Sequence, residues 1–264
     1  MPPARPVRRL AVVTNGRVEE TRLAFETVRR IAEGAGVELV EDDGSPDLAV
    51  VLGGDGTMLR ALQRFLGTEV PVIGVNFGRV GFLASIQPNE LESGLARVFS
   101  GDYRVMPLTT LDVEAGAARA TAVNDVVVLS AIRGRMVELA WAVGGEDLGV
   151  QPCDGMICST PSGSTAYNLS NGGPVLVRGL DAMAVTFIAP HSLHVRPLVV
   201  PRGLDLEVRN RTVDVSASVL VDGHMLAEIE TSEPITIRLG EQRSLLAVLP
   251  ETTFFRRYRE TFGS

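Results

Sequence analysis

Asp55 lies in the glycine-rich segment Gly53-Gly54-Asp55-Gly56-Thr57. The glycines permit positive φ and leave no Cβ between backbone N–H groups and an approaching phosphate. A carboxylate beside phosphates is electrostatically unfavourable unless it holds a metal ion or takes a proton from a nucleophile. The segment therefore predicts a phosphate-binding loop with one chemically active acid. A tight strand-to-helix turn is the alternative that these residues leave open when taken alone.

Apolar segments on both sides of Asp55 predict how the loop is held. Residues 48–52 are typical of a buried strand, and residues 58–62 indicate a helix that Thr57 is expected to cap. A second glycine-containing cluster, residues 74–83, begins where another apolar run ends. Because ligands collect at the carboxyl ends of strands in open α/β sheets, the two loops are predicted to share one crevice.

Two aromatic residues of the second cluster have different predicted roles. Phe77 is expected to line the crevice. Phe82 adjoins the apolar Leu83 and Ala84, which favours a place in the core. Ordinary turn glycines and core aromatics remain the alternative for the whole cluster.

Two further clusters carry polar groups suited to a nucleotide. Asn124 offers a donor and an acceptor together, which matches an adenine edge, and the neighbouring Asp125 can accept from ribose hydroxyls. Residues 154–174 are dense in hydroxyls and glycines and include Tyr167, whose ring can stack on a planar ligand. The alternatives are a common dipeptide at a strand start and a flexible Ser/Thr-rich loop.

Composition limits the class of protein. A chain of 264 residues that is 45% hydrophobic can bury a substantial core. The net charge of -7 argues against a general nucleic-acid or anionic-membrane binder, so small molecules are the expected ligands. The apolar stretches are broken before they reach membrane-spanning length, and no leader pattern begins the chain, so a cytoplasmic protein is expected. Cys153 and Cys158 are expected to be reduced thiols in or beside a strand.

The pattern of elements changes once along the chain. Up to about residue 100, apolar runs at 10–13, 48–52 and 70–75 alternate with helical spacing at 24, 28, 31 and 35 and at 91, 95 and 98, which predicts an α/β domain with a parallel sheet. Successive strands follow, which predicts a β-rich domain, with examples at 122–129, 137–143, 183–188, 204–208 and 235–239. The predicted domains span 1–102 and 103–249, and the aromatic and basic tail at 250–264 is expected to pack on the first.

Taken with residues 190–193, Arg196-Pro197 and Asp222-Gly223, these clusters resemble the NAD kinase family over nearly the whole chain. The resemblance implies phosphorylation of the 2'-hydroxyl on the adenosine ribose of NAD, giving NADP. Asp55 is then the proton acceptor. The implied donor is ATP or, in some members, inorganic polyphosphate, with a divalent cation that is usually Mg²⁺. Family members are homodimers or homotetramers, and nothing in the resemblance implies nucleic-acid or membrane partners.

The resemblance also implies a role for each site residue. Asn124 meets the adenine, Asp125 meets a ribose hydroxyl, and residues 165–170 surround the adenosine end. Asp154 holds the nicotinamide end with Ala189 nearby, and a partner subunit can contribute residues there. Many members have Glu where this chain has Asp125, and the positions of Arg135 and His224 vary. The metal ligands are left unassigned. The full predicted ligand-binding set is Gly53, Gly54, Asp55, Gly56, Thr57, Phe77, Asn124, Asp125, Arg135, Asp154, Thr165, Ala166, Tyr167, Asn168, Leu169, Ser170, Ala189 and His224.

Two other functions share part of this pattern. A lipid or sugar kinase can use the same Asp55 loop, and that function predicts an apolar acceptor pocket and no phosphorylation of NAD. A non-catalytic dinucleotide sensor can keep the pocket, although a sensor needs no base and this chain retains Asp55. Incubation with NAD, Mg²⁺ and a phosphate donor discriminates among them.

Overall fold

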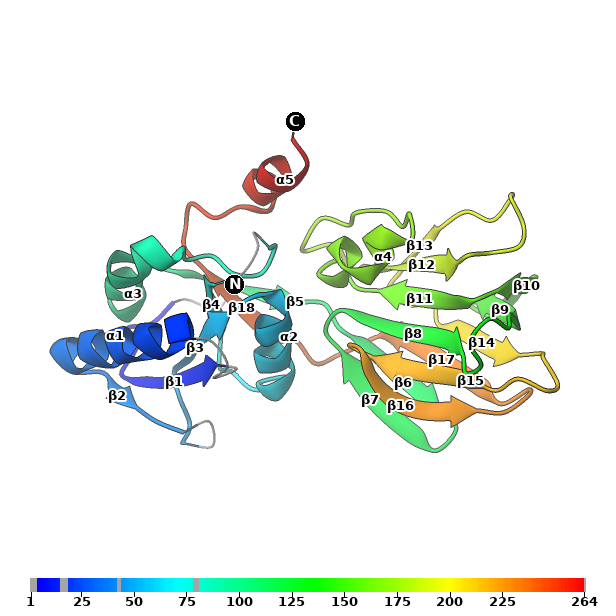
Figure 1. Cartoon of the computed structure of the whole chain (residues 1–264), viewed down its shortest axis with the longest axis horizontal. Coiled ribbons are helices and arrows are strands. Elements are labelled where there is room, and N and C mark those ends of the chain that lie inside the picture. Colours follow the sequence, from blue (N-terminus) through cyan, green and yellow to red (C-terminus); the bar gives the residue numbers. More distant parts are fainter. Residues whose placement is uncertain (1–3, 15–18, 42–43, 78–80, 264) are drawn as a thin grey trace. The chain divides into compact units, whose positions relative to one another are not determined.

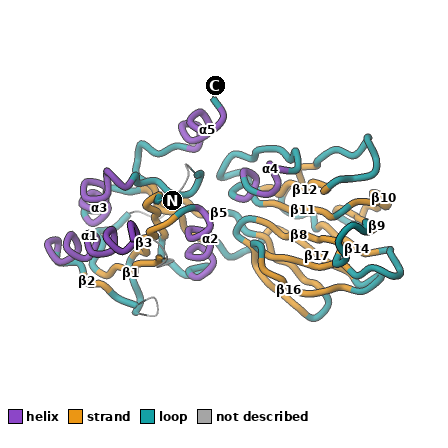
Figure 2. The backbone as a smooth tube through the Cα atoms, in the orientation of Figure 1, coloured by secondary structure: helices purple, strands orange, loops and turns teal. Residues whose placement is uncertain are grey.

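The computed structural model describes residues 4–14, 19–41, 44–77 and 81–263. The chain forms two compact units (Figure 1). The first consists of Met1–Pro107 and Ser244–Ser264, and the second of Leu108–Arg243. Helices are concentrated in the first unit, and strands dominate the second (Figure 2).

The first unit is built on a six-stranded sheet with the order β2-β1-β3-β4-β18-β5. The pairs β1–β2, β1–β3, β3–β4 and β4–β18 are parallel. The strands from residues 48–53 and 72–76 are buried along their whole length, as expected for a parallel sheet covered on both faces. The strands are β1 (Arg9–Thr14), β2 (Glu38–Leu39), β3 (Leu48–Gly53), β4 (Val72–Asn76), β5 (Arg104–Leu108) and β18 (Ser244–Val248).

Helices pack on the two faces of this sheet. Alternate residues of β3, at positions 48, 50 and 52, form one core cluster with helices α1 (Glu19–Ala35) and α3 (Leu91–Phe99). Helix α2 (Asp55–Arg64) buries Met58 and Leu62 outside that cluster, so it covers the opposite face. The predicted helical face of α1 is buried at Ala24 and Val28, but Ala35 at its last turn is exposed. A short 3-10 turn, η1 (Pro88–Glu90), leads into α3.

The C-terminal tail belongs to the first unit, as the sequence predicts. Strand β18 joins the parallel sheet next to β4, and the buried Ser244 hydroxyl donates to the carbonyl of Leu62 at 2.8 Å. Helix α5 (Phe254–Phe262) follows, with Thr253 as its N-cap. The division of the structure falls at residues 107 and 243 rather than at the expected 102 and 249, because β5 and β18 complete the first sheet.

The second unit contains two six-stranded antiparallel sheets (Figure 1). The first has the order β10-β9-β14-β17-β6-β7, with β6 (Leu111–Ala115), β7 (Ala118–Ala122), β9 (Val137–Val143), β10 (Glu146–Cys153), β14 (Leu206–Asn210) and β17 (Pro234–Leu239). The second has the order β13-β12-β11-β8-β15-β16, with β8 (Asp125–Ser130), β11 (Gly155–Ser159), β12 (Ala182–Ile188), β13 (Leu198–Pro201), β15 (Ala217–Val221) and β16 (His224–Ile229). Two short helices, η2 (Gly163–Thr165) and α4 (Tyr167–Ser170), follow β11.

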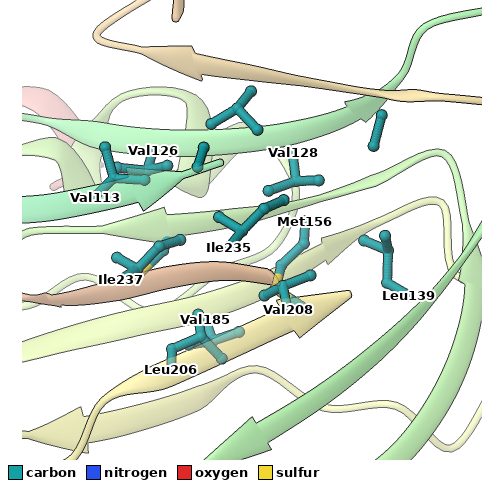
Figure 3. Packing of buried hydrophobic residues seen from close by; sticks show 14 of the residues in the cluster. Val113, Val126, Val128, Leu139, Met156, Val185, Leu206, Val208, Ile235 and Ile237 are labelled. Carbon is teal, nitrogen blue, oxygen red and sulfur yellow. The ribbon is translucent and has the colours of Figure 1, made fainter. Parts of the chain in front are cut away.

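A single hydrophobic core joins these two sheets. Its buried side chains come from both, including Val126, Val128 and Met156 on one side and Val208 and Ile235 on the other (Figure 3). The ring of Trp141 meets Phe187 edge-on, with centroids 5.3 Å apart. The two cysteines are free and buried, at the end of β10 and within β11, and burial raises the pKa of the Cys153 thiol to about 12. The β-rich domain is therefore a sandwich with one core.

One predicted strand is wrong. Residues 122–129 were expected to be continuous, but β7 ends at Ala122 and β8 begins at Asp125. The chain changes sheets between these residues, because β7 lies at the edge of one sheet and β8 in the middle of the other. The break leaves backbone N–H groups without ladder partners, and the side chain that accepts from them belongs to the candidate site.

Candidate functional site

In the first unit, Asp55 begins α2 and its carboxylate lies against the second glycine cluster. One carboxylate oxygen accepts a hydrogen bond from the backbone N–H of Phe82 at 2.9 Å, and the other from Leu83 at 3.3 Å. A Cβ on Gly81 would lie 2.3 Å from Oδ1 of Asp55, so only glycine permits this approach. The Asp55 loop and the end of the 74–83 cluster are therefore in contact. Residues 78–80 of that cluster lie outside the described residues.

The glycines of the loop act differently from the prediction. None of Gly53, Gly54 and Gly56, all within the described chain, has a positive φ. A Cβ on Gly53 would meet the Thr57 hydroxyl at 2.7 Å, whereas Cβ atoms on Gly54 and Gly56 would have no neighbour within 4 Å. Gly53 is thus required by packing, and the open space at the other two leaves room for a ligand beside the start of α2.

Thr57 does not cap α2, contrary to the prediction. The N-cap position is Gly54, with φ -96°, and no side chain caps the helix there. Thr57 lies one turn later and is buried against Gly53. The first N–H groups of a helix have no partner within the helix, so an uncapped start is suited to an anion such as phosphate.

Phe77 and Phe82 differ in their burial, and the place of Phe77 in a crevice shared with the Asp55 loop stays a prediction. Phe77 is half-buried and lines a pocket of about 620 Å³ together with residues of α1 and α3. Phe82 is only 8% exposed, and its ring lies near those of Phe254 and Phe262. Phe82 therefore has a structural role, in which its ring packs near the C-terminal helix.

In the second unit, Asp222 organises the start of β8. Its carboxylate accepts hydrogen bonds from the backbone N–H groups of Val123, Asn124 and Asp125, at 2.8, 2.7 and 3.0 Å. These are the N–H groups that have no ladder partner at the point where the chain changes sheets. The backbone N–H of Asp222 in turn donates to the carbonyl of Asp125 at 3.0 Å.

Asp125 is held in an environment unfavourable to its charge. It is 6% exposed, and this burial, together with the nearby negative charge of Asp222, raises its pKa from 3.8 to about 7. The neutral acid and the carboxylate are therefore both accessible near neutral pH. A group in this state can donate to or accept from a ligand hydroxyl.

Asn124 presents a buried oxygen that lacks a hydrogen-bond partner. Its side-chain Oδ1 is inaccessible and has no donor among the described residues. Buried polar atoms without a partner are rare in folded proteins, so each one indicates a ligand, a water or a functional role. The atom is closed to solvent in this structure, so recognition of an adenine amino group by Asn124 stays a prediction.

The turn after β11 brings the fourth predicted cluster to Asn124. The Thr160 N–H donates to the Asn124 carbonyl at 2.8 Å, and the Thr160 hydroxyl donates to the carbonyl of Val123 at 2.7 Å. A Cβ on Gly163 would lie 2.2 Å from the Asn124 carbonyl oxygen, which explains the glycine. These residues are buried, so the segment is a fixed turn and not a flexible loop.

Asn168 has a different role from its predicted one as a ligand contact. It is fully buried, its amide donates to the carbonyls of Ser164 and Pro174 at 3.0 Å, and its Oδ1 accepts from the Thr186 hydroxyl at 2.7 Å. The nitrogen and the oxygen of the Asn168 amide group thus both hydrogen-bond within the protein and hold the loop together. Its predicted neighbours are partly or fully exposed: Thr165, Ala166, Tyr167, Leu169 and Ser170.

Asp154 and Ala189 lie at the other end of β11 from Asn124. Asp154 directly precedes β11 and is exposed, and its N–H donates to the carbonyl of Ile188, next to Ala189. Ala189 is exposed and has a positive φ of 43°. The five residues of β11 place the two ends roughly 17 Å apart, at about 3.3 Å per residue.

The two variable positions lie at opposite ends of the same sheet. Arg135 is exposed and pairs with Asp214 at 2.8 Å, in a turn that follows β8 on the Asp154 side. His224 begins β16 on the Asn124 side, with Nδ1 3.1 Å from the carbonyl of Asp222. The structure thus brings His224 to Asn124 and Arg135 to the end that holds Asp154.

Asp222 is the residue for which sequence reasoning assigned no role. The Asp222-Gly223 pair contributes to the resemblance, but its three backbone partners are about a hundred residues away. The positive φ of Asp222, 48°, and of Gly223, 81°, form the turn between β15 and β16. An Asp-Gly pair between two apolar strands predicts a hairpin turn, but no local pattern indicates which backbone the carboxylate reaches.

A glycine-rich loop that begins a helix at the end of a parallel strand is typical of α/β proteins that bind a phosphate-containing ligand, and this chain adds a β-sandwich unit to it. Family models for the ATP-NAD kinase N-terminal domain and C-terminal domain match residues 23–103 and 123–248. The chain therefore belongs to the NAD kinase family.

Relatives and solved structures agree with this assignment. The chain is 36% identical to an NAD kinase of Heliobacterium modesticaldum, over 96% of this chain and 91% of the relative, and 36% identical to one of Gemmatimonas aurantiaca, over 86% and 80%. An Archaeoglobus fulgidus NAD kinase, solved in complex with ATP, is 29% identical with a TM-score of 0.78 and 97% coverage of both chains. Yeast NADH kinase, solved with NADH, shares the fold at 23% identity and a TM-score of 0.87, over 98% of this chain and 88% of that one.

Proposed function

We propose that this enzyme transfers a phosphoryl group from ATP to the 2'-hydroxyl of the adenosine ribose of NAD, giving NADP. Membership of the NAD kinase family supports the activity, and the ATP complex of the archaeal relative supports the donor. The observation that carries the proposal is the single carboxylate in the phosphate loop, held in place by the backbone N–H groups of Phe82 and Leu83.

Asp55 is proposed as the proton acceptor. The ribose oxygen forms a bond to the γ-phosphorus as the bond from that phosphorus to the bridging oxygen breaks, and ADP leaves. The proton of the hydroxyl passes to the Asp55 carboxylate. Phosphoryl transfer needs mainly alignment and charge neutralisation from the protein, so a base fixed by two hydrogen bonds suits the reaction.

Asn124 and Asp125 are proposed to recognise the adenosine. The Asn124 amide carries an acceptor and a donor, which match the amino group and a ring nitrogen of adenine when the side chain turns toward the ligand. Asp125 is one methylene shorter than glutamate, and its backbone is held by the Asp222 carboxylate, so its side chain would meet a ribose hydroxyl close to β8. The exposed ring of Tyr167 is available to stack on a planar group.

The residues present fit a magnesium ion that arrives with the nucleotide. The described parts of the chain contain no group of three or more His, Cys, Asp or Glu side chains that could hold a metal ion. Magnesium is usually held by one or two carboxylates together with substrate phosphates, so an ion that arrives on the ATP phosphates needs few ligands from the protein, and these stay unassigned. When bound, the cation would neutralise charge on the donor phosphates.

Asp154 and Ala189 are proposed to hold the nicotinamide end, contributed by a partner subunit of a homodimer or homotetramer. We also propose a cytoplasmic location. No helix in the described parts of the chain has the length and apolar character needed to cross a membrane.

Product analysis tests the activity and the donor together. Purified protein is incubated with NAD, Mg²⁺ and either ATP or polyphosphate, and NADP is measured; NADH replaces NAD in a parallel series. NADP is expected with ATP, and its dependence on Mg²⁺ tests the cation. Diacylglycerol, sphingosine and fructose 6-phosphate are expected to accept no phosphate, because polar groups matched to a dinucleotide would be left unpaired around them. Phosphate transferred to a lipid or sugar, with none on NAD, would contradict the proposal.

A further inference from the structure

Phe82 connects the Asp55 carboxylate to the C-terminal helix α5. Its backbone N–H donates to that carboxylate at 2.9 Å, beside the N–H of Leu83 at 3.3 Å. Its ring, which is only 8% exposed, lies 6.1 Å from the ring of Phe254 and 5.7 Å from that of Phe262. One residue thus contacts the carboxylate through its backbone and α5 through its side chain.

Arg257 joins the same segment to α5 at a second point. Its side chain is 6% exposed, and Nη2 donates to the carbonyl of Ala84 at 2.7 Å while Nη1 donates to Glu260 at 3.3 Å. A buried guanidinium is costly unless it is paired and hydrogen-bonded, so these contacts fix its position. The chain after Ala84 is anchored as well, since the N–H of Ser85 donates to the carbonyl of Gly74 in β4 at 3.1 Å.

Residues 81–84 pack tightly against the Asp55 carboxylate. A Cβ on Gly81 would lie 2.3 Å from Oδ1 and 2.4 Å from Oδ2 of Asp55, so the carboxylate rests directly on the backbone. A displacement of residues 81–84 therefore displaces the carboxylate. Close-packed interiors transmit such shifts because they contain few voids.

We infer that α5 is a positioning element for the Asp55 carboxylate and that Arg257 is a positioning residue for phosphoryl transfer. The inference rests on the proposed role of Asp55. Displacing a reacting group by about 1 Å costs up to about a hundredfold in rate. Asn124 and Asp125 take their positions from β8 and Asp222, so the apparent affinity for NAD is expected to be independent of Arg257.

Steady-state kinetics of three arginine variants test this role. Arg257→Met removes the donors at similar length, Arg257→Lys keeps the positive charge with its donors on a single nitrogen, and Arg256→Met removes a neighbouring arginine that is exposed and pairs with Glu260. We expect Arg257→Met to lower kcat by about 10- to 100-fold, with KM for NAD within about twofold of wild type. Arg257→Lys should recover part of the loss, and Arg256→Met should be close to wild type.

Two phenylalanine variants and amide hydrogen exchange distinguish a positioning role of α5 from an effect of misfolding. Phe262→Ala removes one ring from Phe82 near the end of α5, whereas Phe255→Ala removes a ring that is 68% exposed and contacts Phe254 instead. The first is expected to lower kcat more than the second. Amide hydrogen exchange at Phe82 and Leu83 should be faster in Arg257→Met than in Arg256→Met, because the segment is held less firmly.

The outcomes separate this inference from the proposed activity. A wild-type protein that forms no NADP would overturn the proposed function, and the catalytic role of α5 with it. If the wild type forms NADP and a folded Arg257→Met protein has an unchanged kcat, the inference alone is overturned. The inference would also be overturned if Arg257→Met and Arg256→Met raised KM for NAD and lowered kcat to the same extent.

Discussion

The carboxylate of Asp222 accepts a hydrogen bond from the backbone N–H of Asn124 at 2.7 Å, across 98 positions of sequence. Two further N–H groups, of Val123 and Asp125, donate to the same carboxylate. This contact stabilises the point at which the chain changes sheets and fixes the backbone that presents the Asn124 and Asp125 side chains. A turn between two strands therefore sets the geometry of residues proposed to bind adenosine.

Replacement of Asp222 by Asn is expected to weaken both the fold and NAD binding. An amide has one acceptor oxygen where the carboxylate has two, so at least one of three N–H groups loses its partner, which costs about 1 to 3 kcal/mol in free energy of unfolding. KM for NAD should rise with it. Denaturant unfolding and initial rates measure the two effects. Asp214→Asn is the matched control, because that exposed acid pairs with the Arg135 side chain at the surface, so its free energy of unfolding is expected to stay close to that of the wild type.

Asp125 is expected to make stability depend on pH. Its pKa in the folded protein, about 7, lies above the ordinary value of 3.8, so the folded state binds this proton more tightly than the unfolded state. The resulting stabilisation is fully present below about pH 4 and is lost as the pH rises through 7. Relative to Asp125→Asn, the wild type should lose roughly 2 to 4 kcal/mol of unfolding free energy over this range.

Paired unfolding curves at several pH values test this behaviour, because the variant cancels the contribution of all other groups. Titration of Asp125 should also change the affinity for NAD, because a carboxylate accepts a hydrogen bond from a ribose hydroxyl better than a neutral acid does. Binding of NAD is therefore expected to tighten as the pH rises through 7 in the wild type and not in Asp125→Asn. A pH-independent difference between the two proteins would show that Asp125 does not titrate in this range.

Asn124→Ala is expected to weaken NAD by about 1 to 3 kcal/mol, mainly in KM, because two hydrogen bonds to the adenine are lost. The backbone bond to Asp222 survives this change, so the fold should be kept. Since the Oδ1 atom has no partner in the protein, its removal should cost little stability without ligand. Calorimetric titration with NAD, together with thermal melting, measures both effects, and an unchanged affinity would place the adenine elsewhere.

The sequence predicts the parts of this molecule that depend on local patterns. The apolar runs at residues 48–52 and 137–143 become β3 and β9, because buried strands need little beyond apolar side chains of strand length. The Asp55 loop and the Asn124 pair are recognisable for the same reason, since each is a short group of functional side chains. The basic and aromatic composition of the tail likewise predicts that it packs on the first unit, where it forms α5.

Contacts between distant segments account for what the sequence does not predict. The break at residues 123–124 depends on Asp222, and the fixed position of Asn168 depends on Thr186, so neither is visible in a local window. Strand β18 joins the first sheet through its parallel partner β4, more than 160 residues earlier, although its apolar sequence would suit either domain. The type of the loop glycines predicts that they permit positive φ, whereas none of the three adopts it and Gly53 is required by contact with Thr57.

Asp55→Asn is expected to separate binding from chemistry. The amide keeps the size of the side chain and one oxygen that can accept from Phe82 or Leu83, so the fold and NAD binding should remain within a few-fold of wild type. It cannot take the proton of the ribose hydroxyl, so kcat should fall by roughly 10² or more. Asp102→Asn serves as the control, because this exposed acid pairs with Arg97 on the surface of the same unit and has no part in the loop. Single-turnover measurement of NADP at saturating NAD and ATP reports the chemical step directly, and a rate close to wild type in a folded Asp55→Asn protein would remove Asp55 from the mechanism.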